Sequence, residues 1–272
     1  MQNEQHKIKC VVWDLDNTIW EGILLEDDEV SLNHTVVNSI KTLDERGILH
    51  SISSKNNYND AISKLKSFNL DQYFLYPKIS WQPKSQSISE IAQDLNIGKD
   101  SFAFIDDQNF ELDEVKFSHP EVLCIDVKDI NSILEMPEFT PRFITEDSKK
   151  RRLMYQSDVK RNLLEEEFSG SKEDFLRTLD MEFSVSEATE DDLQRAEELT
   201  VRTHQLNTTG YTYSYDELNQ FRVSASHKLL VSELTDKYGS YGKIGLVLLS
   251  TLGNEWRIKL FLTSCRVISR GV

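Results

Sequence analysis

Cysteine, long apolar runs and positive charge are all scarce in this chain of 272 residues. The cysteines Cys10, Cys124 and Cys265 are far apart and show neither a CxxC pair nor metal-finger spacing, which argues against a disulfide framework or a zinc finger. No apolar run approaches the length of a membrane span, and the N-terminus lacks the apolar core of a signal peptide. A reducing cytoplasm is the expected compartment.

Basic residues are outnumbered, with 31 Lys and Arg against 46 Asp and Glu, for a net charge of -15. An acidic balance of this size argues against nucleic acid as the main partner. The chain shows no internal repeats, and its length is sufficient for two domains.

One stretch near the N-terminus combines an apolar strand with closely spaced acids. The run Ile8 to Trp13 ends in Asp14 and Asp16, with Thr18 two residues later. A short apolar run bounded by polar residues is typical of a strand buried on both faces of a parallel sheet. Two neighbouring carboxylates at its end repel each other and need a cation or a proton between them. By itself, a strand followed by a solvated acidic turn would explain the pattern.

Three more polar groups follow predicted elements in the first half. Ser54-Lys55-Asn56-Asn57 ends the predicted strand 48–53, Lys84 precedes a predicted helix over 85–95, and Asp106-Asp107 follows the predicted strand 101–105. A further strand is predicted over 122–127, and helices alternate with the strands. This alternation predicts an α/β fold, a parallel sheet with helices on both faces. The polar groups are then expected at one sheet edge, where such folds bind ligands.

A break in the alternation at Met136 to Pro141 predicts a boundary between domains 1–140 and 141–272. The second half is predicted to be an α+β domain. Its expected elements are a polar helix over 149–167, a strand over 182–186, a helix ending near residue 205, a short helix opening at residue 214, and strands over 228–234, 244–250 and 256–263.

In this order, the polar groups of the first half resemble the four motifs of the haloacid dehalogenase (HAD) superfamily of phosphotransferases. Asp14-Leu15-Asp16-Asn17-Thr18 resembles the first motif, Ser54 the second, Lys84 the third and Asp106-Asp107 the fourth. The resemblance implies a Rossmann-like sheet. The short stretch between Ser54 and Lys84 leaves no room for a large cap domain, and capless members tend to act on large or protein-borne substrates.

The resemblance also implies roles for these residues. Asp14 would be the nucleophile that forms an aspartyl-phosphate, and Asp16 the general acid and base. Mg²⁺ would be the cofactor, because carboxylates alone would repel a phosphate dianion. The implied metal ligands are Asp14, Asp106, the backbone carbonyl of Asp16, and Asp107 through water. The implied phosphate-binding residues are Thr18, Ser54, Lys55, Asn56 and Lys84.

Longer segments are similar to the FkbH-like (HAD-IIIC) glyceryl transferase/phosphatase family of polyketide pathways. These segments include Val12 to Gly22, Trp81 to Ser85, Arg202 to Asn207 and Ser264 to Val267. His204 stands where this family is expected to have asparagine. The resemblance implies dephosphorylation of 1,3-bisphosphoglycerate and loading of the glyceryl unit, as a thioester, onto the phosphopantetheine arm of an acyl carrier protein.

The second half resembles a GNAT-type acyltransferase fold. That fold is expected to be truncated or incomplete here, because the chain stops at Ser269 to Val272. Cys265 ends an apolar strand beside Arg266, which favours a thiolate. A buried structural thiol remains an equal alternative from the residues alone, whereas the family resemblance favours Cys265 as the acyl-bearing nucleophile. Cys10 and Cys124 are expected to be small buried side chains.

Two other functions remain open. One is a HAD phosphatase that acts on a small phosphorylated metabolite without acyl transfer, and the other is a carrier-protein-binding module without activity. The intact Asp14, Asp16, Lys84 and Asp106 argue against the module. The basic run 149–152 is a candidate docking surface for an acidic carrier protein, or simply a solvated helix face. Trp13, Trp20 and Trp81 are expected to pack in the core.

Overall fold

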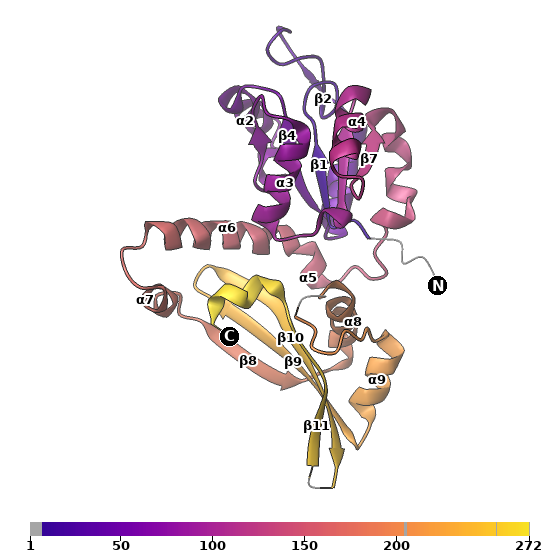
Figure 1. Ribbon diagram of the computed structural model, residues 1–272, viewed down its shortest axis with the longest axis vertical. Coiled ribbons are helices and arrows are strands. Elements are labelled where there is room, and N and C mark those ends of the chain that lie inside the picture. Colours follow the sequence, from indigo (N-terminus) through magenta and orange to yellow (C-terminus); the bar gives the residue numbers. More distant parts are fainter. Residues whose placement is uncertain (1–6, 204–205, 254, 272) are drawn as a thin grey trace. The chain divides into compact units, whose positions relative to one another are not determined.

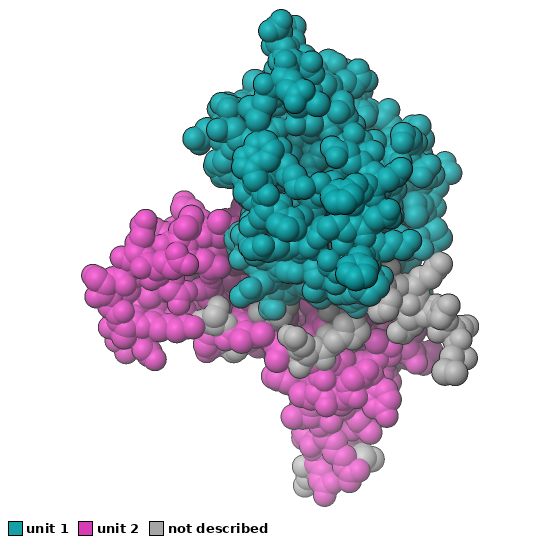
Figure 2. Space-filling model, turned by 45° about the horizontal axis from the view of Figure 1, so that its top comes forward, with its two compact units in different colours: residues 1–152 teal, residues 153–272 magenta. Residues whose placement is uncertain are grey.

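The computed structural model describes residues 7–203, 206–253 and 255–271. The chain forms two compact units that divide between Arg152 and Leu153 (Figure 2). This division lies further along the chain than residue 140, where the break in sequence pattern was expected to mark the boundary. The segment after residue 140 belongs with unit 1 because Arg151 donates to the backbone oxygen of Gly47 at 2.6 Å. None of the described helices is long and apolar enough to cross a membrane.

Unit 1 contains a five-stranded sheet in which every neighbouring pair of strands is parallel (Figure 1). This confirms the parallel α/β sheet expected from the alternation. Buried apolar side chains fill β1, and its two neighbours, β4 and β6, are buried along their whole length. In spatial order the strands are β5 (Lys78–Ile79), β4 (Leu49–Ser54), β1 (Cys10–Trp13), β6 (Phe102–Asp106) and β7 (Leu123–Asp126).

Helices cover this sheet because alternate strand residues face opposite sides. Val11, Trp13 and Ile105 share one cluster with the buried faces of α1, α2 and η3. On the opposite side, α3 and α4 pack against each other and against β4 and β6. The helical elements of unit 1 are α1 (His34–Glu45), α2 (Tyr58–Ser67), η1 (Asp71–Tyr73), α3 (Lys84–Leu95), η2 (Lys99–Ser101), α4 (Asn109–Ser118), η3 (Val127–Glu135), η4 (Pro137–Phe139) and α5 (Glu146–Lys149).

A small flap follows β1. Its strands β2 (Trp20–Glu21) and β3 (Ser31–Leu32) pair antiparallel. Asn17 adopts a left-handed conformation, and its side chain accepts from the Gly22 amide at 3.1 Å. Gly22 has a φ of +99°, and a Cβ there would lie 2.7 Å from a carboxylate oxygen of Asp27. Glycine therefore permits the tight turn that folds the flap back towards the end of β1.

The long polar helix predicted over 149–167 is interrupted. The structure has α5 ending at Lys149, Lys150 outside helical geometry, and α6 running from Arg151 to Glu167. Thr145 caps α5 by accepting from the Ser148 amide at 3.1 Å, so the chain starts a helix earlier than the polar pattern indicates.

Unit 2 is an antiparallel sheet with helices, which agrees with the α+β expectation (Figure 1). One face of the sheet packs against α8 and α9 through Leu193, Leu218, Leu246 and Leu260. Register shifts interrupt β10 near Tyr241 and Ile244. The sheet order is β11 (Glu255–Thr263), β10 (Gly239–Leu252), β9 (His227–Asp236) and β8 (Glu182–Glu187). The remaining elements are α7 (Lys172–Arg177), η5 (Glu190–Asp192), α8 (Leu193–Arg202), α9 (Tyr215–Val223) and η6 (Cys265–Arg270).

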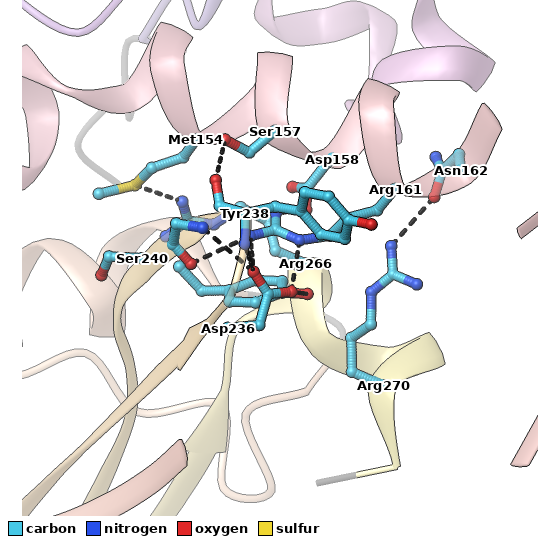
Figure 3. A network of polar contacts seen from close by, with 12 residues as sticks. Met154, Ser157, Asp158, Arg161, Asn162, Asp236, Tyr238, Ser240, Arg266 and Arg270 are labelled. Atoms are coloured by element: carbon cyan, nitrogen blue, oxygen red, sulfur yellow. Dashed lines mark hydrogen bonds and ion pairs between the residues drawn. The ribbon is translucent and has the colours of Figure 1, made fainter. Parts of the chain in front are cut away.

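A buried ionic network joins α6 to the β9–β10 turn (Figure 3). The fully buried Arg161 donates two hydrogen bonds of 2.7 Å to Asp236 and one of 2.8 Å to Asp158. The ring of Tyr241 lies 3.9 Å from the guanidinium carbon, and its hydroxyl donates to Asp236 at 3.0 Å. The Asp236 carboxylate also accepts from the Tyr238 amide at 2.8 Å. Every charged group at the centre of this network has a partner.

Candidate active site

The carboxyl ends of β1 and β6 bring two aspartates to one buried lysine. Asp14 follows β1, Asp106 ends β6, and Lys84 opens α3. The Lys84 ammonium donates to Asp14, lies 3.2 Å from Asp106, and donates to the backbone oxygen of Ser53 at 2.6 Å. All three side chains are at least 93% buried. The structure thus assembles three of the motif residues expected at this sheet edge.

The charges at this centre perturb one another. Burial raises the pKa values of Asp106 and Asp107 above the usual range of aspartate, and repulsion from Asp14 adds to the rise. Burial disfavours the charged form of Lys84, but attraction from Asp14 and Asp106 raises its pKa. The single lysine is therefore held protonated among acids that it does not fully neutralise.

The acids fit a divalent cation. One oxygen from each of Asp14, Asp106 and Asp107 lies within 4.8 Å of the others. One buried oxygen of Asp107 has no hydrogen-bond partner among the described residues, whereas a buried oxygen of Asp106 is paired with the Lys84 ammonium at 3.2 Å. Carboxylate oxygens are the ligands that Mg²⁺ prefers, and it usually takes one or two carboxylates and keeps several waters. This donor set could therefore hold Mg²⁺.

Asp16 is held by the flap and by the loop after β4. One of its oxygens accepts from the indole of Trp20 at 2.7 Å and from the Leu24 amide at 3.0 Å. The other oxygen accepts from the amide of Asn56 at 3.0 Å. Burial raises the pKa of Asp16, and the hydrogen bonds from Leu24 and Trp20 limit the rise. A carboxyl group with a raised pKa can donate a proton at a higher pH than an ordinary aspartate.

The other predicted phosphate-binding residues differ in their surroundings. Thr18 is fully buried, and its hydroxyl has no hydrogen-bond partner among the described residues. Ser54 is buried at the end of β4. Lys55 is paired with Glu111 at 2.5 Å, which neutralises part of its charge. Asn56, predicted to bind phosphate, donates to Asp16 at 3.0 Å, and its phosphate-binding role stays a prediction.

Trp20 and Leu24 contribute to the site through contacts that sequence reasoning missed. The Leu24 contact comes from a backbone amide, which no residue type identifies. The Trp20 contact had a weak signal, because Trp20 lies only four residues after Asp16 and begins the flap. Its indole N–H needs an acceptor once it is buried.

The cysteine predictions have different outcomes. Cys10 is fully buried, and burial raises the pKa of its thiol. Cys124 is partly buried, and burial raises its pKa to about 11. Neither thiol is activated. The backbone of Cys265 opens η6, directly after β11 and Ser264, but its side chain lies outside the described part of the structure. His204 also lies outside the described residues.

The basic run 149–152 is not a free basic face. Arg152 pairs with Asp44 at 2.9 Å, Arg151 is buried, and Lys149 pairs with Glu146 at 2.7 Å. The run 149–152 was expected to be a candidate docking surface for a carrier protein. The structure contradicts this expectation, because Arg151 and Arg152 both bind within unit 1.

The tryptophans near the motifs do not all pack in the core. Trp13 and Trp20 are fully buried as expected, whereas Trp81 is 70% exposed. The prediction was wrong for Trp81 because this residue lies in the connection between β5 and α3, outside both elements.

Comparisons with known proteins give matches among solved structures only. No protein-family model matches the chain, and no curated protein matches it. The phosphatase-domain-containing N-terminal part of a Bacteroides fragilis protein, complexed with Mg, is 29% identical, with a TM-score of 0.38. That alignment covers 56% of the present chain and 40% of the other, so this chain spans less than half of the length of that structure.

Two further solved structures each resemble less than half of this chain. A HAD-superfamily hydrolase from Ehrlichia chaffeensis is 16% identical, covering 44% of this chain and 87% of that one, with a TM-score of 0.37. A 3-deoxy-D-manno-octulosonate 8-phosphate phosphatase from Moraxella catarrhalis, in complex with magnesium, phosphate and its sugar, is 18% identical. The alignment covers 40% of this chain and 63% of the phosphatase, with a TM-score of 0.33.

Proposed function

We propose that unit 1 is a Mg²⁺-dependent phosphatase of the HAD type. The observation that carries this proposal is the cluster of the buried Asp14 and Asp106, both paired with the buried Lys84, and the half-buried Asp107 beside them. A purely structural site would not gather more buried acids than it can neutralise, because each unpaired buried charge is costly. A site for a metal and a phosphoryl group needs this arrangement, since phosphoryl transfer depends mainly on charge neutralisation and positioning.

Asp14 is proposed as the nucleophile. A carboxylate oxygen of Asp14 forms a bond to phosphorus while the bond between phosphorus and the ester oxygen breaks. Asp16 gives its proton to the departing alcohol oxygen and later takes a proton from the water that attacks the aspartyl-phosphate. The attack by water releases inorganic phosphate and restores Asp14. The hydrogen bonds from Trp20, Leu24 and Asn56 fix the direction of the Asp16 carboxyl group.

The remaining polar groups bind the phosphoryl oxygens. Lys84 supplies a fixed positive charge beside Asp14, and the hydroxyls of Ser54 and Thr18 are available as donors. Asp14, Asp106 and Asp107 would hold Mg²⁺, with the Asp16 carbonyl as a further ligand. When bound, Mg²⁺ would neutralise the negative charge of the phosphoryl group.

A finer proposal is that the full chain is a glyceryl transferase/phosphatase serving an acyl carrier protein. In this proposal unit 1 removes phosphate, and unit 2 forms a GNAT-like domain that binds the acyl group and the carrier. The Cys265 thiolate attacks the acyl phosphate of 1,3-bisphosphoglycerate, phosphate leaves, and the thioester passes to the pantetheine thiol. The sequence resemblance supports this proposal, as does the position of Cys265 directly after the last strand of the sheet. The alternative is a phosphatase for a small phosphorylated metabolite, without acyl transfer.

The phosphatase proposal is tested by phosphate release with Mg²⁺ present. Asp14→Asn should lower turnover by about 10⁴-fold or more, because it removes the nucleophile. Asp126→Asn is a matched control, since Asp126 ends the neighbouring strand β7 and asparagine can keep its hydrogen bond to the Lys128 amide. Undiminished activity of Asp14→Asn, or of the wild type in excess EDTA, would reject the proposed site.

The glyceryl transfer proposal is tested separately by intact-protein mass spectrometry. After incubation with 1,3-bisphosphoglycerate, the wild type should carry a glyceryl adduct that transfers to a carrier protein. Cys265→Ala should lose the adduct and the loading of the carrier while it still releases phosphate. An adduct that persists on Cys265→Ala, or maps to Cys10 or Cys124, would contradict the role of Cys265. Phosphate release without any adduct on the wild type would favour the small-metabolite alternative.

A further inference from the structure

Exposed large hydrophobic side chains are unevenly distributed over unit 1. Four of them lie in the motif loops, which are the segments that follow β1, β4, β5 and β6 and which include the first turns of α2 and α4, where Tyr58 and Phe110 lie; only two lie elsewhere. The four on the motif loops have exposed fractions between 49% and 73%. The complete set among the described residues of unit 1 is Leu25, Tyr58, Trp81 and Phe110 on the motif loops, with Phe117 and Ile144 elsewhere.

Two of these side chains are tied to Asp16 through a near neighbour in sequence. Leu25 follows Leu24, whose amide donates to Asp16 at 3.0 Å. Tyr58 lies two residues after Asn56, whose side chain donates to Asp16 at 3.0 Å. Since consecutive Cα atoms are about 3.8 Å apart, neither can be far from the proposed general acid.

The other two side chains are tied to the buried charge cluster. Trp81 follows Ser80, whose amide donates to the Ser54 backbone at 3.0 Å, and Lys84 comes three residues later. Phe110 lies two residues after Gln108, whose amide donates to Asp106 at 2.9 Å. The four side chains therefore come from the four motif loops at the carboxyl edge of one sheet.

Single exposed hydrophobic residues are common on protein surfaces and need no explanation. Phe117 is such a residue, because it is 92% exposed near the far end of α4 from the site. The placement of one apolar side chain on each of four loops around a polar centre is different. The organic part of a substrate whose phosphoryl group binds at this centre is expected to lie near these segments.

We infer that Leu25, Tyr58, Trp81 and Phe110 form an apolar collar that contacts the organic part of the substrate. The inference rests on the proposed phosphatase function and adds the class of substrate, namely phosphate monoesters whose organic part is an apolar chain or ring. Each aromatic side chain of the collar loses water-exposed apolar area when such a group lies against it. A short polar group would leave this area exposed.

The collar is tested by binding, without reliance on hydrolysis. Octylphosphonate and ethylphosphonate carry the same phosphonate head and cannot be hydrolysed, so the ratio of their Kd values reports contacts beyond the head group. Measured by titration calorimetry on the full chain with Mg²⁺, octylphosphonate should bind about tenfold more tightly, because a buried methylene strengthens binding up to about fourfold. A three-carbon glyceryl group would cover little of the collar, so this preference would favour a substrate longer than 1,3-bisphosphoglycerate.

Substitutions then locate the contacts. Trp81→Ala and Phe110→Ala should each reduce the ratio of the two Kd values, and the double variant should bring it near one. Phe117→Ala is the matched control, since it removes an even more exposed ring from the same helix as Phe110, and it should keep the wild-type ratio. Equal Kd values on the wild type, absence of phosphonate binding, or an equal loss of preference in Phe117→Ala would overturn the collar.

Hydrolysis distinguishes failure of the collar from failure of the proposed function. Octyl and ethyl phosphate are both esters of primary alcohols, so their chemical reactivity is similar. Release of phosphate from both at equal kcat/KM would overturn the collar and leave the phosphatase in place. A preference for octylphosphonate without release of phosphate from either ester would support the collar and contradict the phosphatase.

Discussion

Each unit of this protein buries a basic side chain among carboxylates, but the two arrangements differ in how fully they are paired. In unit 2, Arg161 donates to Asp158 and Asp236, and both oxygens of Asp236 accept additional hydrogen bonds from Tyr238 and Tyr241. In unit 1, Lys84 faces both Asp14 and Asp106, while Asp107 also lies nearby. In the unit 2 network, Arg161, Asp158 and Asp236 all find their partners within the protein.

The unit 1 cluster has acceptors to spare. One buried oxygen of Asp107 and the hydroxyl of Thr18 have no hydrogen-bond partner among the described residues. A buried polar group without a partner costs free energy, so each one calls for an explanation, and a ligand that satisfies the group is one such explanation. Complete pairing therefore indicates a structural role, and incomplete pairing with excess negative charge indicates a site for a cation and a phosphoryl group.

The largest expected effect is on catalysis in unit 1. Lys84→Met removes the one positive charge among the described residues that pairs with both Asp14 and Asp106. Phosphate release should therefore fall by about 10²–10³-fold, as for the loss of one charge-stabilising group. The variant should lose stability in EDTA and regain much of it in Mg²⁺, because the ion can replace the missing charge. Steady-state kinetics and thermal unfolding with and without Mg²⁺ would measure both effects. Wild-type activity in Lys84→Met would contradict the conclusion that the unit 1 cluster is a catalytic site and the unit 2 network a structural one.

The corresponding change in unit 2 should affect stability alone. Arg161→Leu leaves Asp236 buried without its cation, so the unfolding free energy of unit 2 should fall by about 3–5 kcal/mol. Mg²⁺ should not restore it, and phosphate release should be unchanged at temperatures where the unit is folded. Arg177→Leu is the control, because its pair with Asp174 is exposed and such pairs contribute about 0–1 kcal/mol. Rescue of Arg161→Leu by Mg²⁺ would break the distinction between the units.

Metal addition should stabilise only the incomplete cluster. At a free Mg²⁺ concentration of about 100 times its Kd, the unfolding free energy of unit 1 should rise by about 2.7 kcal/mol. Asp106→Asn should reduce this gain, since it removes one ligand charge. Asp126→Asn should keep the gain, although Asp126 is the register partner of Asp106 on β7. Calorimetric unfolding over a range of Mg²⁺ concentrations would measure the gain, and an equal response of both variants would contradict the assignment.

The smallest expected effect concerns one hydrogen bond in the complete network. Tyr241→Phe keeps the ring against Arg161 but removes the hydroxyl that donates to Asp236, which should cost about 1 kcal/mol. Tyr238→Phe is the matched control, because its backbone amide, not its hydroxyl, donates to Asp236. Urea unfolding of both variants would compare them. A cost for Tyr241→Phe as large as for Arg161→Leu would show that the network depends on the hydroxyl more than on the ion pair.

The unit 1 sheet and the position of its site could be predicted from sequence because both depend on local patterns. Apolar runs that end in polar residues identify the strands, and the parallel sheet then brings Asp14, Lys84 and Asp106 to one edge. The contacts of Asp16 could not be predicted in the same way. They come from a backbone amide of Leu24 and from Asn56, whose side chain could equally have pointed to a ligand.

In unit 2 the strands could be predicted but their pairing could not. Short apolar runs in β9 and β10 indicate strands, whereas the register shifts near Tyr241 and Ile244 depend on side-chain packing across the sheet. The engagement of Arg151 and Arg152 with Gly47 and Asp44 also escaped prediction, because it joins residues about a hundred positions apart. A run of basic residues in the sequence does not indicate which distant residues will bind them.

The pairing of Arg161 with Asp236 sets an order for events during synthesis. The two residues are 75 positions apart, and the arginine is made first. At a synthesis rate of 5–20 residues per second, Arg161 is added to the chain roughly 4–15 s before Asp236. During this interval the guanidinium must stay in water, since burying it without its carboxylate is unfavourable. The β9–β10 turn therefore has to form before α6 can dock, so an early element of the sequence joins its unit late.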